Sequence, residues 1–128
     1  MKQFEIKISN SEVNYEEAVM YMESRVDGII NNKSEELIWF LNHNHIFTQG
    51  TSASKEEILN SDIIDVIKSN RGGKTTYHGP GQRIVYFMIN LNNKNKDIRK
   101  FITIIENSLI SFLANYNIEA QTLSLIHI

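Results

Sequence analysis

The chain has 128 residues, with 13 basic and 15 acidic side chains and a formal net charge of −2. This length predicts one domain, and the balanced charge argues against a nucleic-acid-binding protein, which usually presents a basic face. No apolar run approaches the roughly 18 residues that span a bilayer, and the N-terminus lacks the apolar core of a signal peptide. We therefore predict a cytoplasmic protein that has neither nucleic acid nor a membrane as a partner.

Short strands and one helix are predicted in the first part of the chain. Residues 4–9 alternate apolar and polar side chains, which is typical of a strand. Apolar residues recur at helical spacing from 15 to 30, and the polar residues on either side predict both helix ends. The continuous apolar run at 37–41 predicts a buried strand, and residues 45–48 predict a second, shorter one.

Five further elements are predicted downstream: a helical turn at 55–59, strands at 63–67, 83–91 and 118–123, and a long amphipathic helix at 98–113. Ser54 is a candidate cap of the helical turn, with Glu57 at the capping-box position. The order of the elements predicts a mixed α/β fold, in which one sheet is covered by at least two helices.

The segment at 71–82 is the candidate site, because it holds four of the six glycines and the only proline. So many glycines serve either a backbone with positive φ or a close approach of the backbone to another group. The sequence Gly-Pro-Gly at 79–81 predicts a tight turn, which we expect to aim Tyr77 and His78 at a common point.

Polar residues of this segment could contact a ligand directly. Arg71 can bind a phosphate or a carboxylate through two parallel hydrogen bonds, and Thr75 and Thr76 can bond to a carbonyl or an amide. An equally weighted alternative is a long connection between two strands, with Arg71 in a surface salt bridge. The segment is neither a P-loop nor a dinucleotide-binding fingerprint, because it lacks the lysine spacing of the first and the helix that follows the second.

Residues 71–82, Arg-Gly-Gly-Lys-Thr-Thr-Tyr-His-Gly-Pro-Gly-Gln, resemble the signature of the bacterial octanoyltransferase family, in which the position of Lys74 varies. The strand that follows is also similar to the family, whose members usually have a proline in place of Phe87. The resemblance extends from the first strand to about residue 122.

An upstream segment carries the second part of the resemblance. Residues 41–50 are similar to the family's Glu-His-Pro-Pro-Val-Tyr-Thr-x-Gly, with three positions kept: His43, Thr48 and Gly50. Three others depart from the family pattern: Asn42, Asn44 and His45. The match of His43 implies a possible residue of the acyl pocket, whereas His45 is expected at the surface.

The resemblance implies a fold of the lipoate and biotin protein ligase type, a mixed sheet flanked by helices. It implies transfer of an octanoyl group from octanoyl-acyl carrier protein to a lysine of lipoyl domains, the first step of lipoyl cofactor synthesis. The acceptors would be lipoyl domains of 2-oxoacid dehydrogenase complexes and the glycine cleavage H protein. No cofactor and no metal are implied, because the donor thioester is already activated. The family's substrate-binding loop matches eight residues here: Arg71, Gly72, Gly73, Lys74, Thr75, Thr76, Tyr77 and His78.

Catalysis in the family proceeds through a cysteine thioester with the help of a nearby lysine. Both residues belong to motifs that come later in the family, Lys-x-Ala-x-Ile-Gly and Pro-Cys-Gly. Neither motif occurs here, and the chain has no cysteine. Lys74 matches a variable position and is not a candidate for the catalytic lysine. We therefore expect no catalytic residue in this fragment and no activity from it.

We interpret residues 1–122 as the N-terminal part of a single catalytic domain, incomplete at its C-terminus, and residues 123–128 as a non-native tail. The tail, Leu-Ser-Leu-Ile-His-Ile, can be encoded by the start of a transposon end that is used as a sequencing adapter. His127 therefore has no expected role. A domain that is cut in this way leaves a sheet edge unpaired and a core face uncovered, which predicts poor solubility.

Two other functions remain open on the sequence alone. One is an ATP-dependent relative of lipoate or biotin ligases, although the Gly-Pro-Gly-Gln after His78 favours the transferase. The other is a non-catalytic module that kept the acyl pocket without the cysteine. A cysteine and a lysine downstream in the full gene would favour the enzyme, and a natural stop codon near residue 128 would favour the module.

Overall fold

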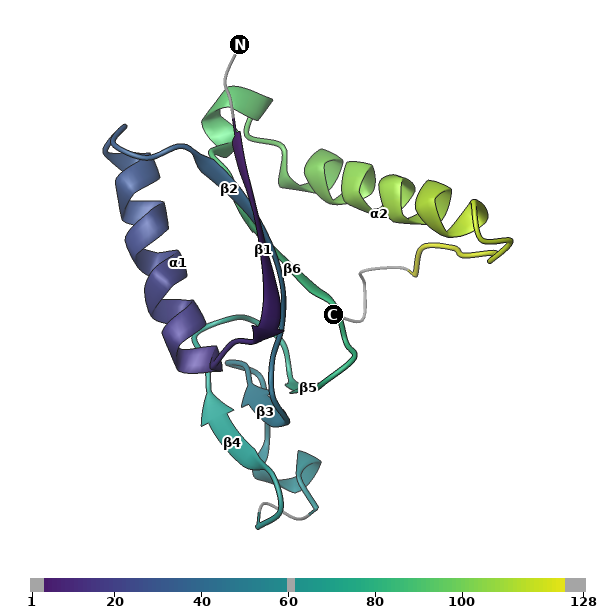
Figure 1. Ribbon diagram of the computed structural model, residues 1–128. Helices are drawn as coiled ribbons and strands as arrows, with labels where there is room; N and C mark the ends of the chain where they lie inside the picture. Colours follow the sequence, from purple (N-terminus) through teal and green to yellow (C-terminus); the bar gives the residue numbers. More distant parts are fainter. Residues whose placement is uncertain (1–3, 60–61, 124–128) are drawn as a thin grey trace. The chain divides into compact units, whose positions relative to one another are not determined.

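The computed structural model describes residues 4–59 and 62–123, and the chain divides into two compact units. The first unit, Met1–Ile89, contains these elements, labelled in Figure 1: β1 (Phe4–Glu12), α1 (Tyr15–Ile30), β2 (Glu36–Asn42), β3 (Ile46–Gln49), the 3-10 helix η1 (Lys55–Glu57), β4 (Asp65–Lys68), β5 (Thr75–His78) and β6 (Ile84–Met88). The second unit, Asn90–Ile128, contains the 3-10 helix η2 (Leu91–Lys94) and α2 (Ile98–Ala114). Within the described ranges, neither α-helix is long and apolar enough to cross a membrane.

The strands of the first unit form two three-stranded sheets, which Figure 1 shows as two groups of arrows. In the first sheet, β2 lies between β1, which is parallel to it, and β6, which is antiparallel. In the second sheet, β3 lies between the parallel β4 and the antiparallel β5. The mixed α/β class is therefore confirmed. The prediction of a single sheet is wrong, because the strands on either side of residues 43–45 pair with different partners.

Helix α1 covers one face of the first sheet (Figure 1). Apolar side chains are buried between the helix and the sheet. The helix begins after Asn14, whose side chain accepts a hydrogen bond from Glu17 N at 3.1 Å. The core cluster combines residues of α1, β2 and β6: Ala18, Ile29, Leu37, Trp39, Leu41 and Met88. Burial of this apolar face stabilises a helix that would be marginal alone.

Strand β1 turns its polar side chains toward α1. Glu5 forms an ion pair with Arg25 of the helix. The ammonium group of Lys7 lies 4.0 Å from the ring centre of Tyr21 and 4.8 Å from that of Trp39, which places it over two aromatic faces. Charges that point inward from an edge strand discourage pairing with other chains.

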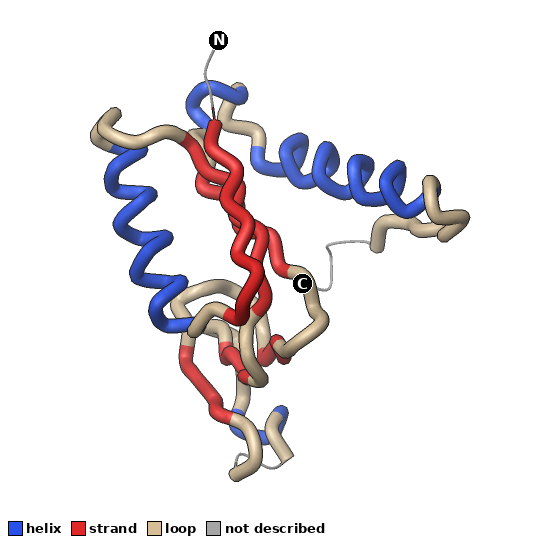
Figure 2. Tube along the Cα trace, viewed as in Figure 1, coloured by secondary structure: helices blue, strands red, loops and turns tan. Residues whose placement is uncertain are grey.

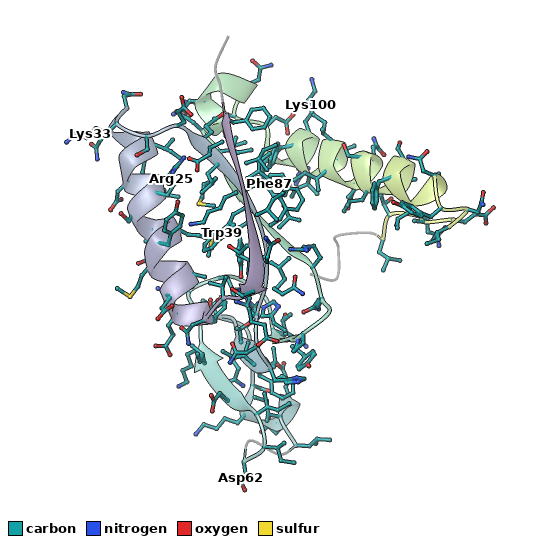
Figure 3. The ribbon with its side chains drawn as sticks, in the orientation of Figure 1. Arg25, Lys33, Trp39, Asp62, Phe87 and Lys100 are labelled. Atoms are coloured by element: carbon teal, nitrogen blue, oxygen red, sulfur yellow. The ribbon has the colours of Figure 1, made fainter. Side chains whose placement is uncertain are left out.

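The opposite face of the first sheet is also apolar. Ile6 and Ile8 of β1 lie on this face and are 57% and 62% exposed. Phe87 of β6 belongs to the same face, and Figure 3 shows it on the other side of the sheet from Trp39. Within the first unit, α1 therefore covers only one of two apolar faces.

The helices at 15–30 and 98–113 are confirmed, and the strands agree with prediction to within a few residues (Figure 2). One exception is the strand predicted at 118–123, which is wrong. Those residues form no strand, and the described part of the second unit offers no strand for them to pair with. The other exception is β5, which lies inside the glycine-rich segment and was not predicted. The proposed tail at 123–128 lies outside the described residues except for Leu123, so it stays a prediction.

Candidate functional site

A cleft of about 770 Å³ opens in the first unit between α1, the turn after β4, and strands β5 and β6. Its size is typical of a small-molecule site, and most of its wall is apolar. The side chains that line it are Tyr15, Glu16, Val19, Met20, Met22, Glu23, Ile67, Lys68, Ser69, Asn70, Arg71, Thr76, His78, Ile84 and Tyr86. The glycine-rich segment thus meets an apolar hollow beside helix α1.

Arg71 ties the glycine-rich segment to strand β3. Its Nη2 donates hydrogen bonds to the carbonyl oxygen of Thr48 at 2.7 Å and to the hydroxyl oxygen of Thr48 at 2.8 Å. Its Nη1 donates to the carbonyl oxygen of Gly72 at 2.9 Å. Both hydrogen bonds to Thr48, which is fully buried, come from the single nitrogen Nη2. They are therefore not the predicted parallel pair to an anion, and binding of a ligand by Arg71 stays a prediction.

Gly50 allows the loop after β3 to pass directly beside the paired glycines. A β-carbon at this position would lie 2.3 Å from the carbonyl oxygen of Gly73 and 2.7 Å from that of Gly72. In addition, Ser52 N donates a hydrogen bond to the carbonyl oxygen of Gly73 at 3.0 Å. The close approach therefore requires glycine at Gly50, which lies outside the glycine-rich segment. Within the segment, Gly73 has a positive φ of +88°, and a β-carbon at Gly72 would meet nothing within 4 Å.

Glu57 holds the start of β5 from the side of η1. Its carboxylate accepts hydrogen bonds from Thr75 Oγ1 at 2.6 Å and from Thr75 N at 2.9 Å. These bonds lower the pKa of Glu57, with smaller contributions from the backbone of Ser54 and the charge of Lys74. The predicted capping box is only half formed, because the Ser54 side chain makes no capping hydrogen bond.

The turn at 79–82 is formed as predicted. Gln82 N donates a hydrogen bond to the carbonyl oxygen of Gly79 at 3.2 Å, and Gly81 has a φ of +82°. A type II turn has this pattern, with proline at the second position and glycine at the third.

Tyr77 and His78, however, do not point to a common place. They are successive residues of β5, and successive side chains of a strand lie on opposite faces. His78 lines the cleft, whereas Tyr77 packs edge-on against Phe47 and hydrogen-bonds through its hydroxyl to His45 Nδ1 at 2.5 Å. The expectation that the turn aims both residues at one point is therefore wrong.

His43 is fully buried at the end of β2. Its Nδ1 lies 2.7 Å from the carbonyl oxygen of Val13, and its Nε2 lies 2.9 Å from the hydroxyl of Tyr86. Burial lowers the pKa of His43, against a smaller opposing effect of the Val13 carbonyl. Burial also raises the pKa of Tyr86 to about 12, with a smaller contribution from Tyr15, so this phenol keeps its proton.

His78 lies beside His43, with 5.7 Å between the ring centres. It is also stacked on Tyr15 at 6.1 Å. Burial lowers the pKa of His78, and the charges of His43 and Arg71 act in the same direction, against a hydrogen bond that the ring donates to the Gln82 side chain. Within the described ranges, its buried Nδ1 has no hydrogen-bond partner in the protein. His78 thus contributes to the cleft wall a ring whose pKa is lowered by burial and whose buried Nδ1 is unpaired among the described residues.

The structure brings only part of the predicted loop to the cleft. Arg71, Thr76 and His78 line it, whereas the cleft-lining set does not include Gly72, Gly73, Lys74, Thr75 or Tyr77. His43 does not line the cleft either; it lies behind the rings of Tyr15, His78 and Tyr86. Whether these residues bind substrate stays a prediction.

Sequence reasoning did not identify the apolar wall of the cleft. Val19 and Met22 of α1 and Ile84 of β6 have the spacing of ordinary core residues, and Met22 and Ile84 do pack against the core. No local pattern distinguishes a side chain that faces a cleft from one that faces the core. Only the resemblance, which implies an acyl pocket, could have prompted a search for such a wall.

Two further observations complete the survey. A hollow of about 860 Å³ lies in the second unit between α2 and the residues after it, and none of the predicted site residues lines it. Within 4–59 and 62–123, the structure contains no group of three or more His, Cys, Asp or Glu residues that could hold a metal ion.

Comparison with known families identifies the class of the protein. The family model of the lipoyl protein ligase A/B catalytic domain matches residues 14–124, which include α1 and the whole glycine-rich segment. The chain belongs to this family. The predicted resemblance to octanoyltransferases is also confirmed, because the relatives described next carry that name.

The chain is 43% identical over 117 residues to the octanoyltransferase of Bartonella henselae, covering 91% of this chain and 48% of that protein. It is 42% identical over 117 residues to the octanoyltransferase of Ehrlichia canis, covering 91% and 55%. It is 43% identical over 115 residues to the octanoyltransferase of Neorickettsia sennetsu, covering 89% and 55%. The chain therefore spans about half the length of the curated relatives it matches.

Proposed function

We propose that the whole protein is an octanoyltransferase and that the cleft of the first unit binds the octanoyl group. The observation that carries the proposal is the composition of the cleft. Val19, Ile67 and Ile84 offer an apolar wall to an alkyl chain, and transfer of such a chain out of water is favourable. Thr76 and His78 offer polar groups that can hold the acyl carbonyl.

The proposed donor is octanoyl-acyl carrier protein, and the proposed acceptor is a lysine of lipoyl domains in 2-oxoacid dehydrogenase complexes and the glycine cleavage H protein. A thiolate attacks the donor carbonyl, the carrier thiol leaves, and the acceptor amine then displaces the enzyme thiol to form an amide. The 128 residues contain no cysteine. We therefore expect this chain to bind the acyl group and not to transfer it. The reaction needs no metal and no cofactor, and we place it in the cytoplasm.

Binding of a thioester probe tests the proposal. S-octanoyl-N-acetylcysteamine is titrated into the 128-residue chain and followed by backbone amide shifts. We expect the largest shifts at Thr76, His78 and Val19, and no shift with the acetyl analogue. Shifts that are equal for both thioesters, or that map away from the cleft, would contradict the proposal.

A matched pair of helix variants adds a control. Val19→Glu places a charge in the cleft, and we expect it to abolish binding of the octanoyl probe. Val26→Glu introduces the same charge two turns later on the same helix, at a side chain that is 39% exposed and outside the cleft-lining set. We expect this control to bind the probe as the unmodified chain does. Equal binding by both variants would place the acyl site elsewhere.

A further inference from the structure

His43 is a buried titratable residue that the proposed function leaves without a role. It is 0% exposed and is not part of the cleft wall, yet its ring contacts three residues that are. We propose that His43 is a positioning residue, which holds the ring of Tyr86 in place as a wall of the acyl site. This inference rests on the proposed function, because it assigns His43 to the same cleft.

The hydrogen bonds of His43 fix its tautomer. The carbonyl oxygen of Val13 can only accept, so Nδ1 of His43 carries the hydrogen and donates it across 2.7 Å. In the neutral ring Nε2 is then an acceptor, and it receives the hydroxyl hydrogen of Tyr86 across 2.9 Å. The imidazole thus connects the segment before α1 to strand β6 through one directed chain of hydrogen bonds.

This chain of hydrogen bonds also decides which part of Tyr86 meets a ligand. The hydroxyl group of Tyr86 is bonded to a fully buried partner that lies behind the cleft, so the cleft is lined by the aromatic ring. Without the acceptor at His43, the hydroxyl would need another partner, and the cleft offers mainly apolar surface. The position of Tyr86 is therefore coupled to the protonation and tautomer of His43.

The neighbouring rings support the same role. Tyr15 contacts the His43 ring edge-on at 5.3 Å, and His78 and Tyr86 contact it at 5.7 Å and 5.9 Å. Each of these three neighbours lines the cleft. A substitution of His43 would therefore affect the acyl site by displacing the side chains that line it, although His43 itself does not contact the ligand.

A double-mutant cycle on the 128-residue chain tests the inference, with S-octanoyl-N-acetylcysteamine as the probe. His43→Asn keeps a donor near Val13 and removes the acceptor of the Tyr86 hydroxyl. We expect it to weaken probe binding by about tenfold, the effect of one orphaned buried hydroxyl. In a Tyr86→Phe background, which has no hydroxyl to orphan, the same substitution should change binding by less than about twofold. His45→Asn, the same change at an exposed histidine outside the cleft-lining set, is the control and should leave binding unchanged.

An equal loss in both backgrounds would overturn the inference, because a residue that only fills space would act independently of the Tyr86 hydroxyl. A second measurement covers the case in which a variant does not fold. The ring nitrogen shifts of His43 in the ligand-free, unmodified chain should show a hydrogen on Nδ1 and none on Nε2, and the opposite tautomer overturns the inference. The measurement of the ring nitrogen shifts needs no ligand. If the unmodified chain fails to bind the probe, that result therefore counts against the proposed function and not against the tautomer of His43.

Discussion

Three hydrogen bonds of Arg71 end on oxygen atoms of Thr48 and Gly72. Hydrogen bonds from a charged donor are stronger than those between neutral groups, and they position a planar guanidinium group firmly. Arg71 therefore acts first as a tie between β3 and the glycine-rich segment. Arg71 shares this end of the cleft with other polar residues, among them Ser69, Thr76 and His78.

Replacement of Arg71 by lysine should destabilise the first unit. An ammonium group keeps the charge but cannot span the carbonyl and hydroxyl oxygens of Thr48 together with the carbonyl of Gly72. We expect Arg71→Lys to lower the free energy of unfolding by about 1–3 kcal/mol in urea denaturation. Lys74→Arg, at an exposed position three residues later, is the control and should change it by less than about 0.5 kcal/mol. Equal stability of the two variants would show that Arg71 is not a tie.

The residues of the site differ in how far sequence could predict them. The turn at 79–82 was predictable, because its glycines and proline determine it locally. The partners of Arg71 and Glu57 were not, because they lie 23 and 18 residues away in the chain. Both the turn and the resemblance singled out His78, which lines the cleft, and its role in binding substrate stays a prediction. Its separation from Tyr77 was not predicted, because the glycine-rich composition concealed strand β5.

At the scale of the elements, β5 depends on few contacts. It is a four-residue strand at the edge of the second sheet, paired with β3 alone among the described strands. Two hydrogen bonds from Thr75 to the carboxylate of Glu57 attach its first residue to η1. Strand β5 carries the cleft-lining residues Thr76 and His78. The positions of these two residues therefore depend on the hydrogen bonds to Glu57.

Removal of the Glu57 carboxylate should loosen β5 while the first sheet stays intact. We expect Glu57→Ala to accelerate hydrogen exchange of the Thr75 amide by about tenfold, because that amide loses its acceptor. Exchange at Trp39, in the core of the other sheet, should stay unchanged. Glu56→Ala, on the same 3-10 turn, is the matched control. Unaltered exchange at Thr75 in Glu57→Ala would mean that β5 is held by β3 alone.

Element types were predictable where apolar periodicity is strong. Helices α1 and α2 and strands β2 and β6 all have long apolar patterns, and each was found close to its predicted range. The division into two sheets was not predictable, because a local pattern does not reveal which strand pairs with which. Strand β5 escaped prediction for a related reason: Thr75–His78 becomes a strand only through its pairing with β3.

At the scale of the whole molecule, we expect the apolar face opposite α1 to limit solubility. Ile6 and Ile8 are more than half exposed on that face. We expect the double variant Ile6→Thr/Ile8→Thr to raise the soluble fraction and to weaken binding of an apolar dye, since threonine keeps the β-branched shape of a strand residue. Its thermal midpoint should stay close to that of the unmodified chain. Leu37→Thr, on the buried face of the same sheet, is the contrast and should cost about 2 kcal/mol or more.

Stability should also fall in acid because of the paired histidines. Burial lowers the pKa of both His43 and His78 from an ordinary value of 6.5, and the charge of Arg71 adds to the effect on His78. Tyr15 packs against both rings, and Tyr86 packs against that of His43. Burial raises the pKa of Tyr86 to about 12, so this phenol adds no negative charge. Below pH 6.5 the unfolded chain therefore binds more protons than the folded one, and protons favour unfolding.

The sign of this linkage defines the experiment. Above pH 6.5, the contribution of these two histidines to the free energy of unfolding should not change with pH. As the pH is lowered from 6.5 toward their folded pKa values, the free energy of unfolding should fall progressively. Urea denaturation at about pH 8, 7, 6 and 5 measures it. Carboxylates also lower the free energy of unfolding at acid pH. The fall in the unmodified chain is therefore compared with the fall in His43→Asn and in His78→Gln, and we expect it to be smaller in each variant. The same fall in both variants as in the unmodified chain would assign the acid sensitivity to other groups and would remove the two histidines as its source.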